Sequence, residues 1–167
     1  MADDLEFRPV PAGSGDAAEL VAAMVAEMAE LYDGLDLEAP GMPAAGPAEL
    51  GPPDGVYLVG YRDGRPGSPP GGAKVAVCGG GLKRLPDGTC EIKRMYVVPS
   101  ARRSGVARAL LAALEDAARG LGYRVARLDT GERQPHAQAF YEASGYRRVG
   151  NFNDNPAAAF HGEKQLD

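Results

Sequence analysis

The segment from Arg102 to Ala107, which reads RRSGVA, places two arginines beside small residues where a strand gives way to a helix. A β-branched run precedes it and apolar residues at helical spacing follow it, so its last residues should begin the helix. The first N–H groups of a helix lack intrahelical partners and carry a partial positive charge, which favours an anion there. Gly105 would let the anion approach closely, and Arg102 and Arg103 would add donors suited to phosphate. The segment is therefore predicted to bind an anionic ligand; the alternative is an ordinary turn whose arginines are solvated.

Two well-known phosphate loops do not fit this segment. A P-loop ends in Gly-Lys followed by Ser or Thr, and the dinucleotide-binding fingerprint needs three spaced glycines. Neither pattern occurs here. Ser104 has no histidine or acid placed to activate it as a nucleophile, so we expect it to cap the helix. His136 and His161 also stand apart from any metal-ligand or triad spacing, and we expect surface or helix-start positions for them.

The hydrophobic pattern around this segment predicts both strands and helices. We expect strands at 5–10, 56–62, 73–85, 89–98 and 123–129, two more within 145–150 and 157–166, and helices at 16–34, 106–121 and 135–144. Asp16 and Glu19 have the spacing of a capping box at the start of the first helix. Residues 39–55 are rich in Pro, Gly and Ala and should form a surface loop with a short helical turn near 44–50.

Two hairpins and one crossover would assemble these elements into a sheet. The turns at 63–72 and 86–88 make the three middle strands an antiparallel meander. The helix at 106–121 then returns the chain, so that strand 123–129 runs parallel to strand 89–98. The predicted fold is of the α/β class, a mixed and mostly antiparallel sheet with helices on both faces.

Length and charge limit the classes of protein that fit. The 167 residues, 44% hydrophobic and 25% charged, suit one globular domain over 1–167. The net charge is -5, yet residues 83–108 hold seven basic residues against two acidic ones. A basic island in an acidic chain favours a bounded anionic ligand over nucleic acid.

Hydropathy and cysteine content help to predict the cellular compartment of the protein. No run approaches the roughly 20 apolar residues of a membrane span, and the first ten residues are acidic rather than basic and then apolar. We therefore expect a cytoplasmic protein without a membrane partner. Cys78 and Cys90 lack paired metal-ligand spacing, so we expect reduced core residues, with neither a disulfide nor a metal site.

Two longer segments, EIKRMYVVPSARRSGVARALL and AFYEASGYRRVG, resemble the core of the GNAT superfamily of N-acetyltransferases. That family's pyrophosphate loop has Arg or Gln, two free positions, Gly, one free position, and Gly or Ala. Arg102, Gly105 and Ala107 hold these places. The family's later motif is matched by Ala137, Phe140, Tyr141, Gly145 and Tyr146. Gln134 stands where many members have Asn.

The resemblance implies a GNAT-like acyl-CoA N-acyltransferase fold, with acetyl-CoA as cosubstrate and its pyrophosphate on the amides of Arg103 to Ala107. The pantetheine arm would lie beside the strand before the loop and pair with its backbone, as an added strand does. The cofactor-binding residues that it implies are Met95, Tyr96, Val97, Arg102, Arg103, Ser104, Gly105, Val106, Ala107, Gln134, Ala137 and Phe140.

Acyl transfer to an amine needs a base and an acid, and the resemblance offers one candidate for each. Glu91 lies on the strand before the loop, where several GNAT enzymes carry a Glu that acts through water; a carboxylate can accept the proton of an ammonium group. The alternative for Glu91 is a surface ion pair with Lys93. Tyr141 is the candidate acid because its phenol pKa of about 10 lies near that of an alkyl thiol. The alternative for Tyr141 is an aromatic core residue beside Phe140.

The expected function is an acetyl-CoA-dependent N-acetyltransferase that uses direct attack in a ternary complex. A catalytically silent acyl-CoA-binding module is the alternative of a different class, and such a module need not keep Glu91 and Tyr141. Homodimers are frequent in such folds, so a homodimer is possible. Asp129 and Thr130 end a parallel strand, where α/β sites often gather, and could support the site.

The acceptor is expected to be a small-molecule or peptide amine, entering between the loops around 32–55 and the C-terminal strands. Two sets of charged residues could meet it. Asp33, Asp36 and Glu38 would attract a cationic amine, whereas Arg133 and Lys83 would suit a carboxylate.

Overall fold

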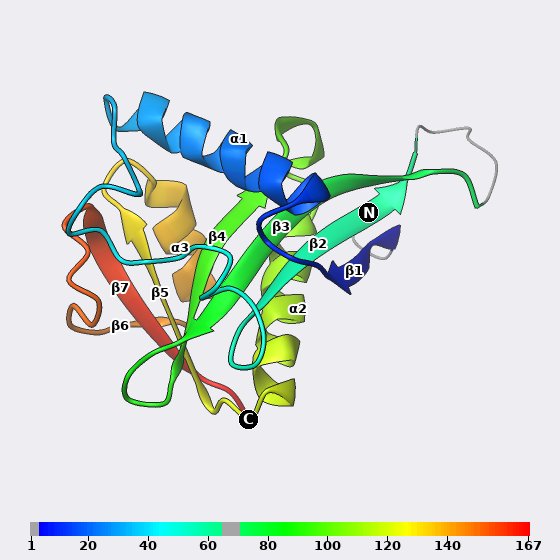
Figure 1. Ribbon diagram of the computed structural model, residues 1–167. Coiled ribbons are helices and arrows are strands. Elements are labelled where there is room, and N and C mark those ends of the chain that lie inside the picture. Colours follow the sequence, from blue (N-terminus) through cyan, green and yellow to red (C-terminus); the bar gives the residue numbers. More distant parts are fainter. Residues whose placement is uncertain (1–3, 65–70) are drawn as a thin grey trace.

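Runs of β-branched and aromatic residues separated by turn residues pair here into one mixed sheet. The computed structural model describes residues 4–64 and 71–167 (Figure 1). Its strands are β1 (Glu6–Pro9), β2 (Val56–Asp63), β3 (Lys74–Arg84), β4 (Cys90–Val97), β5 (Val125–Gly131), β6 (Arg147–Arg148) and β7 (Ala158–Gln165). Its helices are α1 (Gly15–Leu31), the 3-10 turn η2 (Pro99–Ala101), α2 (Val106–Gly120) and α3 (Pro135–Ala143).

The described strands are ordered β1-β2-β3-β4-β5-β7-β6 across the sheet. Strands β4 and β5 run parallel, and the other neighbouring pairs are antiparallel. The parallel pair follows from the α2 crossover, because such a connection returns the chain in the same direction. The predicted mixed, mostly antiparallel sheet is therefore confirmed. The hairpin turn at 86–88 is also confirmed, whereas residues 65–70 of the expected turn at 63–72 lie outside the described residues.

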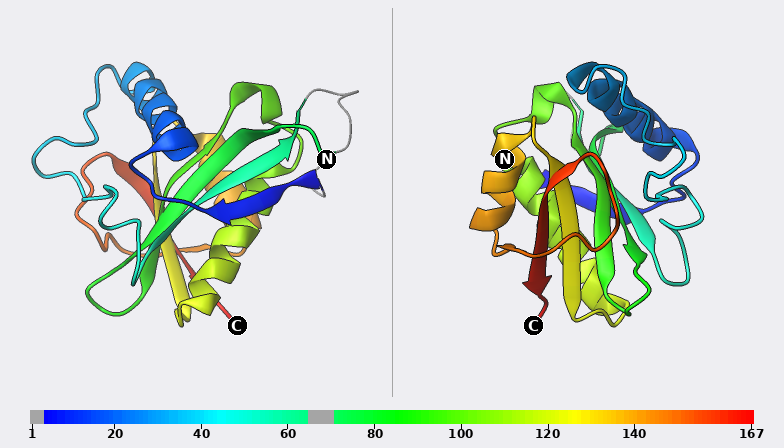
Figure 2. Two further views of the ribbon diagram at one scale, coloured as in Figure 1. Left: turned by 45° about the vertical axis from the view of Figure 1, so that its right-hand side comes forward. Right: turned by 90° about the vertical axis from the view of Figure 1, so that its left-hand side faces the viewer.

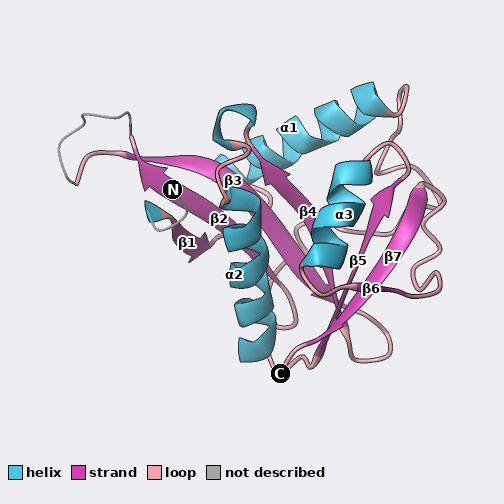
Figure 3. Cartoon of the chain, turned by 180° about the vertical axis from the view of Figure 1, so that it is seen from behind, coloured by secondary structure: helices cyan, strands magenta, loops and turns pink. Residues whose placement is uncertain are grey.

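Helices cover both faces of the sheet, as predicted. Helix α1 lies on one face, and α2 and α3 lie on the other, which is seen from behind in Figure 3. The turned views of Figure 2 show α1 and α3 on opposite sides of β4 and β5. The larger core lies under α2, whose apolar stripe buries Val106, Leu110, Leu111, Leu114 and Ala118. Cys78 and Cys90 are buried, unbridged core residues, as expected. None of the described helices is long and apolar enough to cross a membrane.

Strands β4 and β5 separate after a short stretch of pairing. Only Cys90 with Ala126 and Glu91 with Arg127 are in register, and Figure 1 shows the strands spreading towards their carboxyl ends. On its other side β4 carries a β-bulge, because Lys93 faces Gly81 while Tyr96 faces Gly79. The carboxyl half of β4 is therefore not paired with β5.

The predicted helix caps are wrong at two places. Helix α1 begins at Gly15 after Ser14, without a side-chain cap, because Asp16 instead accepts a hydrogen bond from the Tyr61 hydroxyl at 2.8 Å. Helix α2 has Gly105, not Ser104, as its N-cap; the Ser104 hydroxyl donates to the Ala101 carbonyl at 2.7 Å. In both cases the side chain that the sequence assigned to the cap forms a hydrogen bond with another group instead.

The loop at 39–55 is more than a surface loop. The expected helical turn amounts to one hydrogen bond, from the Leu50 amide to the Gly46 carbonyl. The Leu50 side chain is 1% exposed and packs with Tyr57 and Val59 in a second, smaller core under α1. Apolar burial therefore anchors a segment whose composition predicts only turns.

Candidate active site

The start of α2 forms a groove that holds most of the residues expected to bind the donor. It has a volume of about 530 Å³. Its lining includes the predicted cofactor residues Val97, Arg102, Arg103, Gly105, Val106, Ala107 and Phe140. Arg103 and Gly105 have positive φ angles of 62° and 82°, which turn the backbone sharply into the helix. The unpaired amides of the first helical turn therefore border the groove, as an anion site requires.

The two arginines of this turn differ in their contacts. The Arg102 guanidinium donates to the Val97 carbonyl at 2.9 Å and pairs with Glu27 of α1 at 2.7 Å. Arg103 makes no hydrogen bond or ion pair with any described residue, so its charge is available to a ligand in the groove. Ser104 and Tyr96, also expected at the cofactor, line neither this groove nor the cavity beyond it.

A cavity of about 140 Å³ with both polar and apolar walls lies on the side of β4 that faces β5. Helix α1 and the loop after it supply an apolar wall that includes Met24, Met28, Leu35 and Leu37. Strands β4 and β5 supply polar groups that include Lys93, Arg94, Asp129 and Thr130. The predicted residues Met95, Gln134, Ala137 and Tyr141 also line this cavity. The cavity is therefore a place for an acceptor with both apolar and charged parts.

Gln134 is the residue that departs from the usual Asn of the family. Its side-chain carbonyl accepts hydrogen bonds from the Tyr32 hydroxyl and the Thr130 hydroxyl, each at 3.3 Å. A glutamine at this position therefore joins the end of α1 to the end of β5 on the cavity wall.

Tyr141 lies where the groove and the cavity meet. It lines the cavity, whereas its neighbour Phe140 lines the groove, and the two half-buried rings are 5.3 Å apart. The Tyr141 hydroxyl has one described hydrogen-bond partner, the Met95 sulfur at 3.7 Å, which is a weak acceptor. Burial, with a smaller contribution from the charge of Asp129, raises the pKa of Tyr141 to about 12. The phenol is thus protonated at neutral pH.

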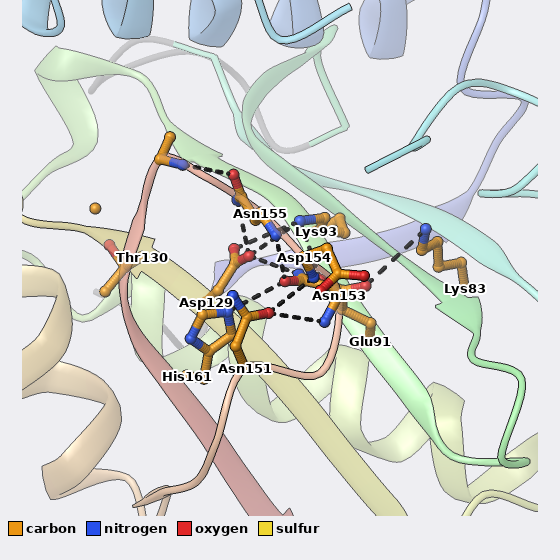
Figure 4. Close-up of polar contacts among 12 residues, drawn as sticks. Lys83, Glu91, Lys93, Asp129, Thr130, Asn151, Asn153, Asp154, Asn155 and His161 are labelled. Carbon is orange, nitrogen blue, oxygen red and sulfur yellow. Dashed lines mark hydrogen bonds and ion pairs between the residues drawn. The ribbon is translucent and has the colours of Figure 1, made fainter. Parts of the chain in front are cut away.

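Glu91 lies behind the cavity wall and does not line it. Its side chain is 0% exposed and pairs with Lys93 at 3.0 Å (Figure 4). The ion pair that sequence offered as an alternative is therefore present, but it is buried rather than at the surface. Oε2 of Glu91 has no hydrogen-bond partner among the described residues, and Lys83 lies 4.0 Å from it.

Asp129 is the carboxylate that reaches the cavity. It lies at the end of β5, 3.4 Å from Lys93, and accepts hydrogen bonds from the side-chain amides of Asn153 at 2.7 Å and Asn155 at 2.9 Å (Figure 4). Burial acts to raise the pKa of Asp129, but Lys93 and the two amides outweigh it, so the pKa is lowered. Sequence indicated a supporting role for this residue only from its place at a strand end.

Asn153 and His161 belong to the same buried group, and neither was expected there. The Asn153 amide donates to Glu91 and to Asp129, each at 2.7 Å. Its carbonyl oxygen lies 3.1 Å from His161 Nε2, so that nitrogen must carry the hydrogen. His161 was predicted at the surface or a helix start and is instead buried on β7. Only the pairing of β7 with β5 could have shown this.

The charged residues proposed for the acceptor are largely engaged elsewhere. Arg133 pairs with Asp33 at 2.8 Å and donates to the Leu31 carbonyl at 2.9 Å. Lys83 donates to the Ala44 carbonyl. Neither cation lines the cavity.

Comparisons with known proteins agree with this architecture. A model of the acetyltransferase (GNAT) family matches residues 24–146. A relative named IAA acetyltransferase, from Azospirillum brasilense, is 35% identical over 103 residues; the match covers 62% of this chain and 61% of that protein, less than two thirds of its length.

Solved structures resemble the whole chain. One, from Klebsiella pneumoniae subsp. pneumoniae, is a protein whose proposed activity is that of an acyl-CoA N-acyltransferase; it is 27% identical with a TM-score of 0.71, covering 98% of each chain. Another is a GNAT family acetyltransferase from Elizabethkingia anophelis with acetyl-CoA bound, 17% identical with a TM-score of 0.67, covering 98% of this chain and 99% of that one.

The mixed sheet with helices on both faces is the fold of these solved acyltransferase and acetyltransferase structures. The chain belongs to the acetyltransferase (GNAT) family.

Proposed function

We propose that the chain transfers the acetyl group of acetyl-CoA to a primary amine by direct attack in a ternary complex. The observation that carries this proposal is the place of Tyr141, between a groove suited to an anionic donor and a cavity that holds a carboxylate. An acyl donor in the groove and an amine in the cavity would meet beside its hydroxyl. Proximity of two bound reactants is itself a large part of such catalysis.

Backbone groups of the turn before α2 and of β4 would hold most of the acetyl-CoA donor. The amides at the start of α2 and the Arg103 guanidinium would hold the pyrophosphate. The pantetheine arm would lie in the gap beyond Glu91, along the part of β4 that does not pair with β5. The Val97 carbonyl already accepts a hydrogen bond from Arg102, which would compete with a hydrogen bond from the pantetheine arm.

The amine would be received by Asp129 and deprotonated with the help of Glu91. Asp129 lines the cavity and, being ionised at neutral pH, would attract an ammonium group. Glu91 lies behind it across Asn153, and its Oε2 lacks a hydrogen-bond donor among the described residues. We assign Glu91 the role of base through water, with Asp129 as the group that positions the amine.

Tyr141 would complete the transfer as the acid. The neutral amine nitrogen attacks the thioester carbon, a backbone N–H of Met95 to Val97 would stabilise the oxyanion, and the C–S bond then breaks. As the amide forms, the nitrogen would release its extra proton to water, and the departing thiolate would take the Tyr141 proton. Solvent would then return a proton to the Tyr141 oxygen. The same desolvation that raises the pKa of the phenol would raise that of the thiol, so the transfer stays close to balanced.

Replacing one hydroxyl tests this assignment. Tyr141→Phe should lower kcat by about 10²- to 10⁴-fold, the usual effect of losing a general acid. The Kd for acetyl-CoA should change little, because the ring remains. The measurements are CoA release with an amine acceptor and calorimetric titration of acetyl-CoA.

A matched control is Tyr123→Phe, which removes a hydroxyl that donates to the Asp54 carbonyl away from both cavities. Its kcat should match that of the wild type. Equal turnover in Tyr141→Phe and wild type would remove Tyr141 from the mechanism. If a broad amine panel releases no CoA although acetyl-CoA binds, the chain is the silent acyl-CoA-binding module instead.

A further inference from the structure

Arg94 occupies an unusual place on the wall of the cavity. It lies in the β-bulge of β4, between Lys93, which faces Gly81, and Tyr96, which faces Gly79. Its φ angle is 60°, a left-handed conformation that favours glycine and strains a residue with a bulky side chain. Such strain persists where the surroundings require it.

The bulge brings side chains to one place that a regular strand would separate. Successive residues of a strand point to opposite faces. Here Lys93, Arg94 and Met95 follow one another and all line the same cavity. The strained turn of the backbone at Arg94 thus adds a guanidinium to a wall that already holds Lys93.

The Arg94 guanidinium has no partner of its own in the part of the chain that the structure describes. Neighbouring Lys93 is paired with Glu91 and Asp129, whereas no described carboxylate or carbonyl hydrogen-bonds to Arg94 or lies within ion-pair distance of it. It is nevertheless half-buried, and burial lowers its pKa, against the opposing charges of Glu38, Asp129 and Glu91. A guanidinium has five donors, and withdrawing them from water without an acceptor is unfavourable. An anionic ligand in the cavity would supply the acceptor.

We infer that Arg94 binds a carboxylate of the acceptor, so that the acceptor is an amino acid with an apolar side chain. This rests on the proposed function, in which Asp129 receives the amine. Asp129 and Arg94 line the same cavity, so one small molecule can contact both groups. The facing wall of Met24, Met28, Leu35 and Leu37 is apolar and would receive the side chain. A carboxylate and a guanidinium form paired, charge-assisted hydrogen bonds.

The test compares acceptors that differ only in the carboxylate. The acceptors are L-leucine, L-methionine and L-phenylalanine, each beside its amide and its decarboxylated amine. For wild type, kcat/KM from CoA release should favour the amino acid by about 10- to 100-fold, as expected for a charge-assisted hydrogen bond. This preference should vanish in Arg94→Gly and Arg94→Gln.

Two controls separate a specific effect from misfolding. Glycine adopts a φ of 60° without strain, so Arg94→Gly should melt at no lower temperature than wild type. Arg124→Gln removes an exposed arginine outside both cavities and should keep the preference for the carboxylate.

The outcomes distinguish this inference from the proposed function. If CoA is released but amino acids hold no advantage, or if the advantage survives in both Arg94 variants, the inference is overturned and the proposed function stands. If no amine releases CoA, the proposed function fails, and calorimetric titration of the CoA complex with the same amino acids decides the inference. Amino-acid binding that is lost in Arg94→Gly supports the inference. No amino-acid binding, or equal binding by wild type and Arg94→Gly, overturns the inference.

Discussion

At the scale of single residues, Asn153 holds the buried charges of the site together. One amide nitrogen donates to Glu91 and Asp129, which would otherwise repel each other without a shared donor. Lys93 supplies the cation between the same two carboxylates. Buried charges are tolerated only where they are paired and hydrogen-bonded. The arrangement therefore fixes the two carboxylates in place before any ligand arrives.

The charge of Asp129 should make stability depend on pH. Its pKa in the folded chain is lowered, so its contribution is complete above the unfolded value of about 3.9 and is lost as pH falls through the lower folded value. Asp129→Asn should therefore be less stable than wild type above about pH 5, and the difference should shrink below pH 4. The measurement is the free energy of unfolding from denaturant titrations across this range.

Asp116→Asn is the matched control, because Asp116 is an exposed carboxylate that pairs with Arg119 on α2. Its difference from wild type should stay small at every pH, as for other surface pairs. A difference for Asp129→Asn that does not vary with pH would contradict a lowered pKa.

At the scale of elements, three successive glycines of β3, Gly79 to Gly81, lie opposite the bulge in β4. A Cβ on Gly80 would lie 3.1 Å from Met95 Cγ and from Leu114 Cδ1, and one on Gly79 would lie 2.5 Å from the Tyr57 hydroxyl. The missing side chain of Gly80 lets β4 and α2 approach β3 beside the bulge, and that of Gly79 leaves room for Tyr57 of β2. The small residues of β3 thus influence the shape of the cavity wall that β4 forms.

A single substitution in the turn before α2 can test whether this turn binds acetyl-CoA. Gly105→Asp should abolish acetyl-CoA binding, because it places a carboxylate and a Cβ in the groove and forces a φ of 82° on a residue with a side chain. Calorimetric titration measures the binding, and far-UV circular dichroism measures the fold.

The matched control is Gly122→Asp, at a position with a similar φ of 92° in the turn that ends α2, away from the groove. It carries the same backbone strain and should still bind acetyl-CoA. If Gly105→Asp binds acetyl-CoA with unchanged affinity, the segment is an ordinary helix start and not an anion site.

The loop at 39–55 should contribute to stability as a core element does. Leu50→Ala should lower the free energy of unfolding by about 2–5 kcal/mol, because it leaves a cavity between Tyr57 and Val59. Leu121→Ala, at a residue 42% exposed, should lower it by much less. Denaturant titration of both variants measures the difference; equal and small effects would show that the loop is not anchored through Leu50.

At the scale of the whole molecule, the site is built where the two helical layers meet the gap in the sheet. Helix α1 brings an apolar wall from one face, and α3 brings Tyr141 from the other. Tyr32 at the end of α1 contacts Gln134 and the Arg133 amide beside α3, which joins the two faces over the cavity. Residues from both helical layers therefore line one cavity, with Tyr141 on its wall.

The sequence by itself determined the antiparallel meander of β2, β3 and β4, the parallel crossover to β5 and the turn before α2, because these follow from local periodicity and from short connections. The later motif likewise placed Tyr141 on a helix. Only the tertiary structure decided which polar groups share one buried space. Asp129 meets Asn153 and His161 through the pairing of β5 with β7, and Arg94 enters the cavity through a bulge opposite glycines. Contacts of this kind depend on the packing of distant segments, which no local spacing encodes.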